Sequence, residues 1–319
     1  MLRGCVDMSS NLPQQALGGD GPRVARIALG CMSLSGTWNP SEVGPDQRQR
    51  AIEAFEIALD AGITLFDHAD IYGGGSCEAL FKDCLGAVPD SRDRIVIATK
   101  GGIRPGYYDL SGPYLVACVE RSLTRMGIEY IDLYQLHRPD PLTHPGETAA
   151  ALNDLVRRGL IRAVGVSNYY PEQVRALQRY LDVAIRSNQI EISLSKLDPL
   201  YEGWSGGDGT LDQCMALGMT PLAWSPLGGG SLFGDRPHPA GAERKSAIVA
   251  ELTRLAARYN ATPVQLALAW LLAHPASIIP LVGSANPAHI REAVGAAGIT
   301  LAREDWYALW TAAWGRRVP

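Results

Sequence analysis

Polar and charged side chains follow several short apolar runs of this chain, at the point where each run ends. Asp67 follows the apolar part of TLFDHA, Lys100 ends IVIATK and His137 ends IDLYQLH. Residues 167–168 (Ser-Asn) and 188–189 (Asn-Gln) occupy the same kind of position farther along. When such runs are parallel strands of a closed barrel, their carboxyl ends meet at the face that carries the active site. The spacing therefore predicts a site for chemistry built from these groups.

One chemistry open to these positions is metal-dependent hydrolysis. His68 and Asp70 lie two residues apart, so both side chains could point inward from one barrel strand and bind a metal ion. The chain has six histidines, however, and His137 is the only other one at the end of an apolar run. We therefore predict no metal site, and keep a metal-dependent barrel hydrolase as an alternative.

The elements that would position these groups recur along the whole chain. Short apolar runs begin near residues 27, 64, 95, 131, 162, 185, 219 and 277, and each is too short for a typical helix. Amphipathic stretches alternate with them. In the first, Ile52, Phe55 and Ala58 share one face and Gly62 can cap the end. Eight strands that alternate with helices predict an α/β fold, a (β/α)8 TIM barrel.

Further helices follow from the same spacing, with Pro171 and Pro287 in first turns, where a missing amide hydrogen is tolerated. The interval after the seventh run is long, and two helical patterns in it predict extra helices, as does a pattern at the C-terminus. Residues 1–20 are predicted to form a flexible tail and 21–319 a single barrel domain. The predicted helices span residues 48–62, 113–127, 146–159, 171–181, 243–260, 263–274, 287–298 and 301–314.

Composition limits the class of protein. With 46% hydrophobic and 19% charged residues, the 319-residue chain is globular rather than disordered or a coiled coil. A net charge of −4 disfavours nucleic-acid and anionic-membrane partners. No stretch approaches the roughly 20 apolar residues of a membrane helix, and the first residues lack the apolar core of a signal peptide. Six scattered cysteines without a C-x-x-C pair predict reduced thiols and a cytoplasmic location.

Six strings of the sequence resemble the aldo-keto reductase superfamily and occur in its order: AGITLFDHADIYGGG, IVIATKGG, SLTRMGIEYIDLYQLHRPD, LIRAVGVSN, NQIEIS and PLAWSPLGGG. The resemblance covers roughly residues 24 to 300. The motifs HADIYGG and HRPD are similar to those of a bacterial oxidoreductase branch. The resemblance implies a (β/α)8 barrel, in agreement with the number of runs, and NADPH-dependent reduction of an aldehyde or ketone to an alcohol.

The resemblance also implies a catalytic set of four residues. Hydride addition to a carbonyl leaves negative charge on the oxygen, which must receive a proton as it forms. A free tyrosine has a pKa of about 10, and a nearby ammonium that lowers this pKa would make it a better acid. In this set Tyr72 is the general acid, Lys100 the ammonium, Asp67 its counter-charge and His137 a hydrogen-bond partner of the carbonyl oxygen.

No G-x-G-x-x-G fingerprint and no P-loop motif is present. The resemblance nevertheless implies a cofactor at the barrel mouth, NADPH or NADP+, with NADH as a second candidate. It assigns Ser167, Asn168 and Gln189 to the nicotinamide carboxamide and Trp224 to a stack on the nicotinamide ring. The loop that approaches the pyrophosphate would comprise Ser225, Leu227, Gly228, Gly229 and Gly230.

The adenosine end matches the family less well. Gly283, Ser284 and His289 align with the segment that binds the adenosine phosphate, and the helix start near Pro287 favours an anion. Family members often have a basic residue in place of Gly283 and an arginine in place of His289. We therefore expect the protein to use NADPH, with weaker discrimination against NADH than strongly basic relatives show.

The expected partner is a small-molecule carbonyl substrate, which the sequence does not specify further. For Arg138, an ion pair with Asp140 or a solvated position is favoured over selection of acidic substrates. A second alternative is a nucleotide-sensing barrel with little turnover, which the intact catalytic set disfavours. Neither the oligomeric state nor the direction of reaction follows from the sequence. The residues that could line the mouth are Trp38, Tyr107, Tyr108, Arg138 and those of segment 229–240.

Overall fold

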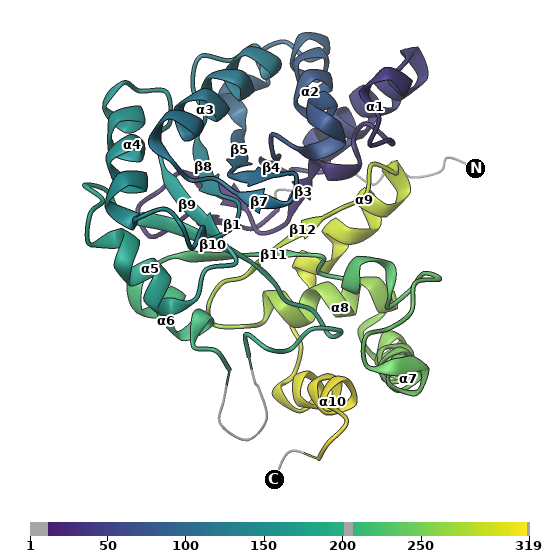
Figure 1. Ribbon diagram of the computed structural model, residues 1–319. Coiled ribbons are helices and arrows are strands. Elements are labelled where there is room, and N and C mark those ends of the chain that lie inside the picture. Colours follow the sequence, from purple (N-terminus) through teal and green to yellow (C-terminus); the bar gives the residue numbers. More distant parts are fainter. Residues whose placement is uncertain (1–11, 201–206, 318–319) are drawn as a thin grey trace.

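The computed structural model describes residues 12–200 and 207–317. Eight parallel strands close into one barrel that helices surround (Figure 1). Their order around the barrel follows their order along the chain, which confirms the predicted (β/α)8 architecture. The barrel strands are β3 (Ala28–Gly30), β4 (Leu65–Asp67), β5 (Val96–Gly101), β8 (Leu133–Leu136), β9 (Val164–Ser167), β10 (Ile185–Glu191), β11 (Thr220–Trp224) and β12 (Ile279–Val282).

Each barrel strand arises from one of the eight apolar runs. Strands β4, β5, β8, β9 and β12 are buried along their whole length. One face of each strand packs in the barrel interior and the other against helices, so the strands are continuously apolar instead of alternating. Inside the barrel, Leu65, Ala98, Leu133 and Leu222 belong to one cluster. This packed interior leaves room for chemistry only at the open carboxyl ends.

Helices cover the outside of the barrel, as predicted, and two of them, α7 and α8, follow β11. Pro171 and Pro287 are the first residues of their helices, and Gly62 lies just beyond α1 with a φ of 85°. The helices are α1 (Pro45–Asp60), α2 (Ser76–Ala87), α3 (Gly112–Met126), α4 (Pro145–Arg157), α5 (Pro171–Gln178), α6 (Thr210–Leu217), α7 (Gly241–Tyr259), α8 (Pro263–Leu272), α9 (Pro287–Val294) and α10 (Arg303–Trp314).

Helices α2 and α6 were not predicted from the sequence. In α2 the residues Cys77, Glu78, Leu80 and Phe81 are all buried, so a charged residue interrupts the apolar face that helical periodicity would show. In α6 the polar Thr210 shares the buried face with Leu211 and Cys214, which weakens the apolar periodicity. Helix α9 ends at Val294, and the predicted remainder to residue 298 is a 3-10 turn, η6 (Gly295–Gly298).

The N-terminal segment is part of the fold from residue 12 onward. Strand β1 (Gln14–Ala16) pairs antiparallel with β2 (Arg23–Ala25). Leu17 and Val24 are buried and pack into the cluster of the barrel interior. The predicted tail over residues 1–20 is therefore wrong over 12–20, because apolar side chains of this hairpin close the amino-terminal end of the barrel. Residues 1–11 of that prediction lie outside the described residues.

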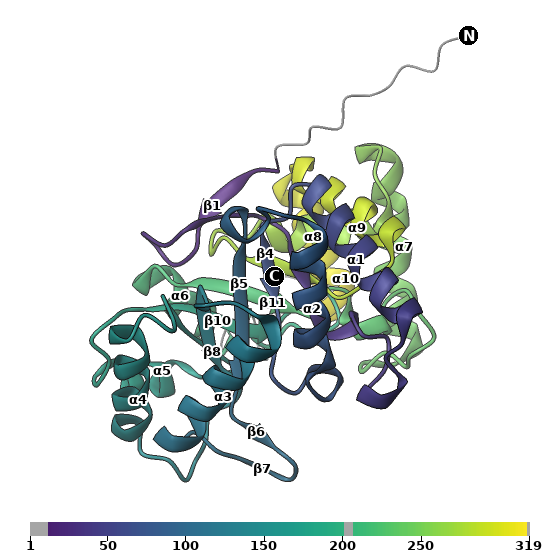
Figure 2. The same ribbon diagram turned by 90° about the horizontal axis from the view of Figure 1, so that it is seen from above.

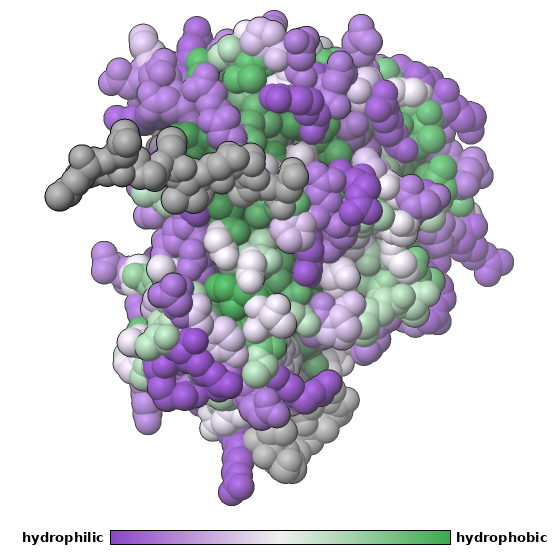
Figure 3. Space-filling model, turned by 180° about the vertical axis from the view of Figure 1, so that it is seen from behind, coloured by the Kyte–Doolittle hydropathy of each residue, from purple (hydrophilic) through white to green (hydrophobic). Residues whose placement is uncertain are grey.

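Short turns and hairpins follow the strands at the opposite, carboxyl end of the barrel. Viewed from above, the β1 strand and the hairpin of β6 and β7 lie at opposite ends of β5 (Figure 2). From behind, hydrophilic side chains cover much of the outline, and hydrophobic ones show in the hollows between them (Figure 3). None of the described helices is long and apolar enough to cross a membrane. The elements at the carboxyl end include η1 (Cys31–Ser33), η2 (Pro40–Glu42), η3 (Tyr72–Gly75), β6 (Ile103–Arg104), β7 (Tyr107–Tyr108) and η5 (Gly228–Gly230).

Candidate active site

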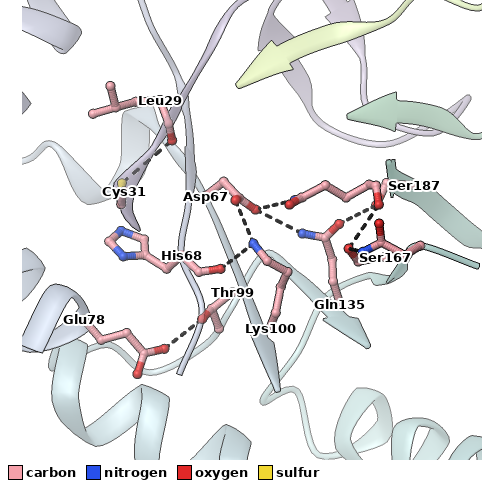
Figure 4. Close-up of polar contacts among 12 residues, drawn as sticks. Leu29, Cys31, Asp67, His68, Glu78, Thr99, Lys100, Gln135, Ser167 and Ser187 are labelled. Atoms are coloured by element: carbon pink, nitrogen blue, oxygen red, sulfur yellow. Dashed lines mark hydrogen bonds and ion pairs between the residues drawn. The ribbon is translucent and has the colours of Figure 1, made fainter. Parts of the chain in front are cut away.

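A buried ion pair lies at the carboxyl end of β4 and β5. Lys100 Nζ donates to Asp67 Oδ2 at 2.7 Å and to the backbone oxygen of His68 at 2.8 Å (Figure 4). Both charged side chains are almost completely buried, at 0% and 2% exposure. The other carboxylate oxygen, Asp67 Oδ1, accepts hydrogen bonds from Gln189 Nε2 at 2.8 Å and from Gln135 Nε2 at 3.2 Å. The barrel thus surrounds Asp67 with donors from three other strands.

Gln135 was not among the predicted site residues. It lies on β8 two positions before His137, so both side chains point to the same face of the strand. A polar residue at this position of an apolar run was the feature that could have predicted its place in the site. Its side-chain oxygen accepts a hydrogen bond from Ser187 Oγ at 3.3 Å, which orients its nitrogen toward Asp67. Gln189 also differs from the expectation in part: it lines the cavity, but its amide nitrogen donates to Asp67.

Tyr72 begins the turn η3, which follows β4. The Lys100 ammonium lies 5.1 Å from the centre of the Tyr72 ring. The ring of His137 lies 6.0 Å from that of Tyr72, with an interplanar angle of 84°. The structure therefore brings Asp67, Tyr72, Lys100 and His137 together, because the carboxyl ends of β4, β5 and β8 are neighbours in the barrel.

The pKa of Tyr72 is raised above its ordinary value. Burial is the largest influence and raises the pKa, the Lys100 charge lowers it, and the Asp67 charge raises it again. The predicted effect of Lys100 is thus present, but the predicted net lowering is wrong. The free energy needed to remove a phenolate from water is larger than the stabilisation that the nearby ammonium provides. In this state the hydroxyl is protonated at neutral pH and available as a proton donor.

His137 is held in its neutral form. Burial, and then the Lys100 and Arg138 charges, lower the pKa of His137 to about 2. The imidazole is 8% exposed and lines the cavity beside Tyr72. Its Nδ1 has no hydrogen-bond partner in the described part of the chain. A neutral imidazole can donate one N–H to a carbonyl oxygen but carries no proton to release at neutral pH.

The pair considered for metal binding has a different environment. The His68 ring packs against Phe81, with 4.4 Å between ring centres, and burial followed by the Lys100 charge lowers its pKa to about 3. In Figure 4 this ring points away from the Asp67–Lys100 pair. The carboxyl group of Asp70 is also buried, and burial raises its pKa to about 6. Within residues 12–200 and 207–317, no group of three His, Cys, Asp or Glu side chains could hold a metal ion.

A cavity of about 850 Å³ opens above these residues. It is lined by Asp67, Tyr72 and His137, whereas Lys100 lies behind Asp67 and does not reach it. The cavity continues along the loop after β11 to the start of α9. Of the residues predicted to bind a cofactor, all except Gly228 line it: Ser167, Asn168, Gln189, Trp224, Ser225, Leu227, Gly229, Gly230, Gly283, Ser284 and His289.

The walls of this cavity suit a dinucleotide. Asn168 Nδ2 donates to Ser167 Oγ at 2.7 Å, and its Oδ1 accepts from Trp224 Nε1 at 3.0 Å, which fixes the indole at the mouth. Asn168 and Ser225 have left-handed backbones, with φ of 59° and 48°, and such outliers concentrate at functional sites. A Cβ at Gly283 would meet nothing within 4 Å, so the backbone there faces open space. These features leave a long channel with polar groups at one end.

The far end of the channel is only weakly basic. Ser284 Oγ and His289 Nδ1 lie 3.0 Å apart and so interact with each other. Asn286 Oδ1 caps α9 by accepting from the Ala288 amide at 2.9 Å, which uses one of the free amides of the helix start. The acidic Glu292 also lines this end. No arginine or lysine of α9 lines the cavity.

Arg138 does not pair with Asp140. The Asp140 carboxylate instead accepts hydrogen bonds from the amides of Leu110 and Leu142. Among the described residues Arg138 has no hydrogen bond or ion pair, and its guanidinium lies 5.8 Å from the centre of the Trp224 ring. Arg138 borders both the 850 Å³ cavity and a neighbouring one of about 400 Å³. Of the two environments expected for Arg138, the ion pair with Asp140 is absent, and the partly exposed guanidinium at the mouth fits the other, a solvated position.

The other predicted mouth residues divide between these two cavities. Trp38, Phe233 and Arg236 line the larger cavity, and Tyr108 lines the smaller one. Tyr107, the neighbour of Tyr108 in the β6–β7 hairpin, lines neither. Trp38 and Phe233 come from loops after different strands, so the mouth carries aromatic groups on two sides.

Comparison with known proteins identifies the family. Residues 26–313 match the family model described as Aldo/keto reductase family. The chain belongs to this family. It is therefore an oxidoreductase, and this membership overturns the alternative of a metal-dependent hydrolase.

Relatives of this aldo/keto reductase include proteins named as a reductase and an oxidoreductase. The chain is 42% identical over 310 residues to a 6-dehydroglucose reductase of Novosphingobium aromaticivorans, covering 95% of this chain and 96% of that one. It is 35% identical over 308 residues to the oxidoreductase YdhF of Escherichia coli, covering 94% and 97%.

Solved structures of the same family have the same fold. The thermostable aldo-keto reductase Tm1743, solved with the inhibitor epalrestat, is 28% identical, with a TM-score of 0.80 and coverage of 94% of this chain and 100% of that one. An aldo/keto reductase of Klebsiella pneumoniae, solved with NADP and acetate, is 25% identical, with a TM-score of 0.76 and coverage of 93% and 94%.

Proposed function

We propose that this aldo/keto reductase reduces an aldehyde or ketone to an alcohol, with NADPH as the hydride donor and Tyr72 as the general acid. One observation carries the proposal: Tyr72 and His137 face the same cavity, beside the buried pair of Lys100 and Asp67. Proton donation, charge stabilisation and orientation of the carbonyl oxygen are thus available within one site.

Each of the four side chains has a separate role in the reduction. The Tyr72 hydroxyl donates its proton to the substrate oxygen, and the Lys100 ammonium stabilises the phenolate that remains. Asp67 holds the ammonium in place and charged, since burial lowers the pKa of Lys100 but the Asp67 and Tyr72 charges together raise it above its ordinary value. Neutral His137 donates a hydrogen bond to the same substrate oxygen and so fixes its position. NADPH, when bound, would supply the hydride.

The channel residues would hold the cofactor. Ser167 and Asn168 offer polar groups for the nicotinamide carboxamide, and Trp224 offers a ring for stacking. The loop of Ser225 and η5 offers backbone amides to the pyrophosphate, where glycine permits close approach. The Klebsiella pneumoniae neighbour solved with NADP and acetate, and another aldo-keto reductase of that organism solved with NADPH, support this choice of cofactor. Ser284 and His289 would lie at the adenosine end.

For the substrate, we propose a hydroxylated aldehyde, with 6-dehydroglucose as the first compound to test. Two relatives, 42% and 38% identical, carry the name 6-dehydroglucose reductase. The mouth of this chain also offers the Arg138 guanidinium, which can bind hydroxyl groups.

The test is turnover of purified protein with NADPH and a panel of 6-dehydroglucose, simple aldehydes and ketones, followed by loss of NADPH absorbance. Tyr72→Phe is expected to remove most of the turnover while leaving NADPH affinity near the wild-type value, because the substitution deletes only the acidic hydroxyl. NADPH binding without turnover across the panel would favour a nucleotide sensor instead. Near-normal turnover by Tyr72→Phe would show that another group is the acid.

A further inference from the structure

A second ion pair, with a fully buried carboxylate and a guanidinium that is 32% exposed, lies behind the turn that carries Tyr72. Glu78, in the first turn of α2, is completely buried, and its Oε2 accepts a hydrogen bond from Arg125 Nη1 of α3 at 3.1 Å. Its Oε1 accepts one from Thr99 Oγ1 of β5 at 2.7 Å, as Figure 4 shows. None of the roles proposed above involves Glu78, Thr99 or Arg125.

Arg125 contacts the Tyr72 turn on both sides of the tyrosine. Its Nη1 donates to the backbone oxygen of Asp70 at 2.8 Å, two residues before Tyr72. Its guanidinium also packs against Gly75, where a Cβ would lie 2.5 Å from Arg125 Cζ. A side chain at position 75 would thus displace the guanidinium, which Glu78 holds at that place.

The same pair is joined to the strand of the catalytic lysine. Thr99 immediately precedes Lys100 on β5, so the two side chains point to opposite faces of the strand. Lys100 faces Asp67 inside the barrel, and Thr99 faces Glu78 outside it. Glu78 thus connects two parts of the site through its two oxygens. One oxygen bonds to Thr99 on β5, the strand that carries Lys100, and the other bonds to Arg125, which contacts the turn of Tyr72.

The turn itself has little stiffness of its own. Gly73, Gly74 and Gly75 follow Tyr72 directly and all have left-handed backbones, with φ of 57°, 65° and 96°. Three successive glycines lose much conformational entropy on ordering, and both local hydrogen bonds, such as that from Ser76 Oγ to Gly73 O at 2.7 Å, and tertiary contacts hold the turn. Among these contacts, Arg125 supplies the only ion-paired group that the described residues place against the backbone on both sides of Tyr72.

We propose that Glu78 and Arg125 are positioning residues that hold the Tyr72 hydroxyl at the Lys100 ammonium. They do not line the cavity and act only through the turn. Their loss therefore changes the position of the Tyr72 hydroxyl but not its chemical identity as the proton donor. The inference rests on the proposed role of Tyr72 as general acid. It adds that the geometry of this acid is set from outside the barrel.

The first test is Glu78→Gln, which keeps the size of the side chain and an oxygen for Thr99 but removes the charge that holds Arg125. With the fastest substrate of the aldehyde panel, we expect kcat to fall by about 100-fold, the loss typical of a misplacement of about 1 Å. KM and the Kd for NADPH, measured by quenching of protein fluorescence, should stay near the wild-type values. Arg125→Lys keeps the cation and part of the pairing. Its kcat should therefore fall less than that of Glu78→Gln.

A matched control is available at the other end of β5. Asp132 is also buried, pairs with Arg92 at 2.9 Å and accepts a hydrogen bond from the Ile97 amide of β5 at 2.9 Å. Asp132→Asn is expected to lower the thermal midpoint as Glu78→Gln does, yet to leave kcat near wild type. Equal loss of kcat in the two variants would overturn the proposal, since it would then reflect general loss of packing.

A double variant separates this inference from the proposed function. If Glu78 acts only through the phenol, Tyr72→Phe combined with Glu78→Gln should be no slower than Tyr72→Phe alone. A further loss in the double variant would overturn the positioning role. Full turnover by Tyr72→Phe would instead overturn the role of Tyr72, whatever the behaviour of Glu78→Gln. Glu78→Gln with wild-type kcat would refute the positioning role alone.

Discussion

Lys100 Nζ and Asp67 Oδ2 lie 2.7 Å apart inside the barrel, where solvent reaches neither side chain appreciably. Removal of one partner from such a pair leaves an uncompensated buried charge, which costs about 3–5 kcal/mol. We therefore expect Lys100→Met to lower the thermal midpoint. We also expect it to reduce kcat by at least about 100-fold, within the range that a positioned acid contributes.

The double variant Lys100→Met, Asp67→Asn separates these two effects. It removes both charges, so stability measured by denaturant unfolding should recover toward the wild-type value, whereas kcat should stay low. Recovery of turnover in the double variant would contradict the role of the ammonium in stabilising the phenolate.

The neutral state of His137 predicts the pH dependence of the reaction. Because its pKa is about 2, the imidazole does not titrate near the usual histidine pKa of about 6.5. We expect kcat/KM with an uncharged aldehyde to show no step that belongs to His137 between about pH 5 and 8. The comparison is with His137→Gln. A step that is present in the wild type and absent in this variant would show that His137 titrates during catalysis.

Acid stability should depend on His68. Its pKa is about 3 in the folded chain and about 6.5 when unfolded, so between these values the unfolded state binds more protons and folding weakens as pH falls. His68→Leu should therefore reduce the acid dependence of the unfolding free energy, by up to about 1.4 kcal/mol per pH unit in this window. An unchanged slope in urea unfolding experiments would contradict the neutral burial of His68.

Asp70 supplies a control whose effect on the pH dependence of stability is opposite to that of His68. Its folded pKa of about 6 lies above the ordinary 3.8, so the folded state binds more protons between these values and gains stability as pH falls. Asp70→Asn should thus make the acid loss of stability steeper than in the wild type. A shallower loss would show that Asp70 stays ionised in the fold.

The weakly basic adenosine end predicts a modest cofactor preference. Ser284 and His289 interact with each other, and Glu292 adds a carboxylate nearby. The wild-type ratio of Kd values for NADH and NADPH, at fixed salt, should stay below about a thousandfold, or about 4 kcal/mol. His289→Arg should raise the ratio about tenfold, because a guanidinium can form bidentate bonds to a phosphate. No change in the ratio would place the phosphate elsewhere.

Much of the site was predictable because the barrel forces strand ends together. Asp67, Lys100 and His137 end neighbouring parallel strands, so identifying the strands is enough to predict that these side chains converge. Tyr72 needed the family resemblance, since a tyrosine in a loop has no periodicity that assigns it to a site. Gln135 was missed because one amide within an apolar strand is a weak signal by itself.

The sequence alone determined the alternation of eight apolar runs with helices and the polar groups at the run ends, since both depend on local spacing. Only the tertiary structure decided the state of those groups. Burial and the Asp67 charge outweigh Lys100 and raise the pKa of Tyr72, and Asp140 bonds to backbone amides instead of Arg138. Such outcomes depend on desolvation and on contacts between residues far apart in the chain, which no local pattern records.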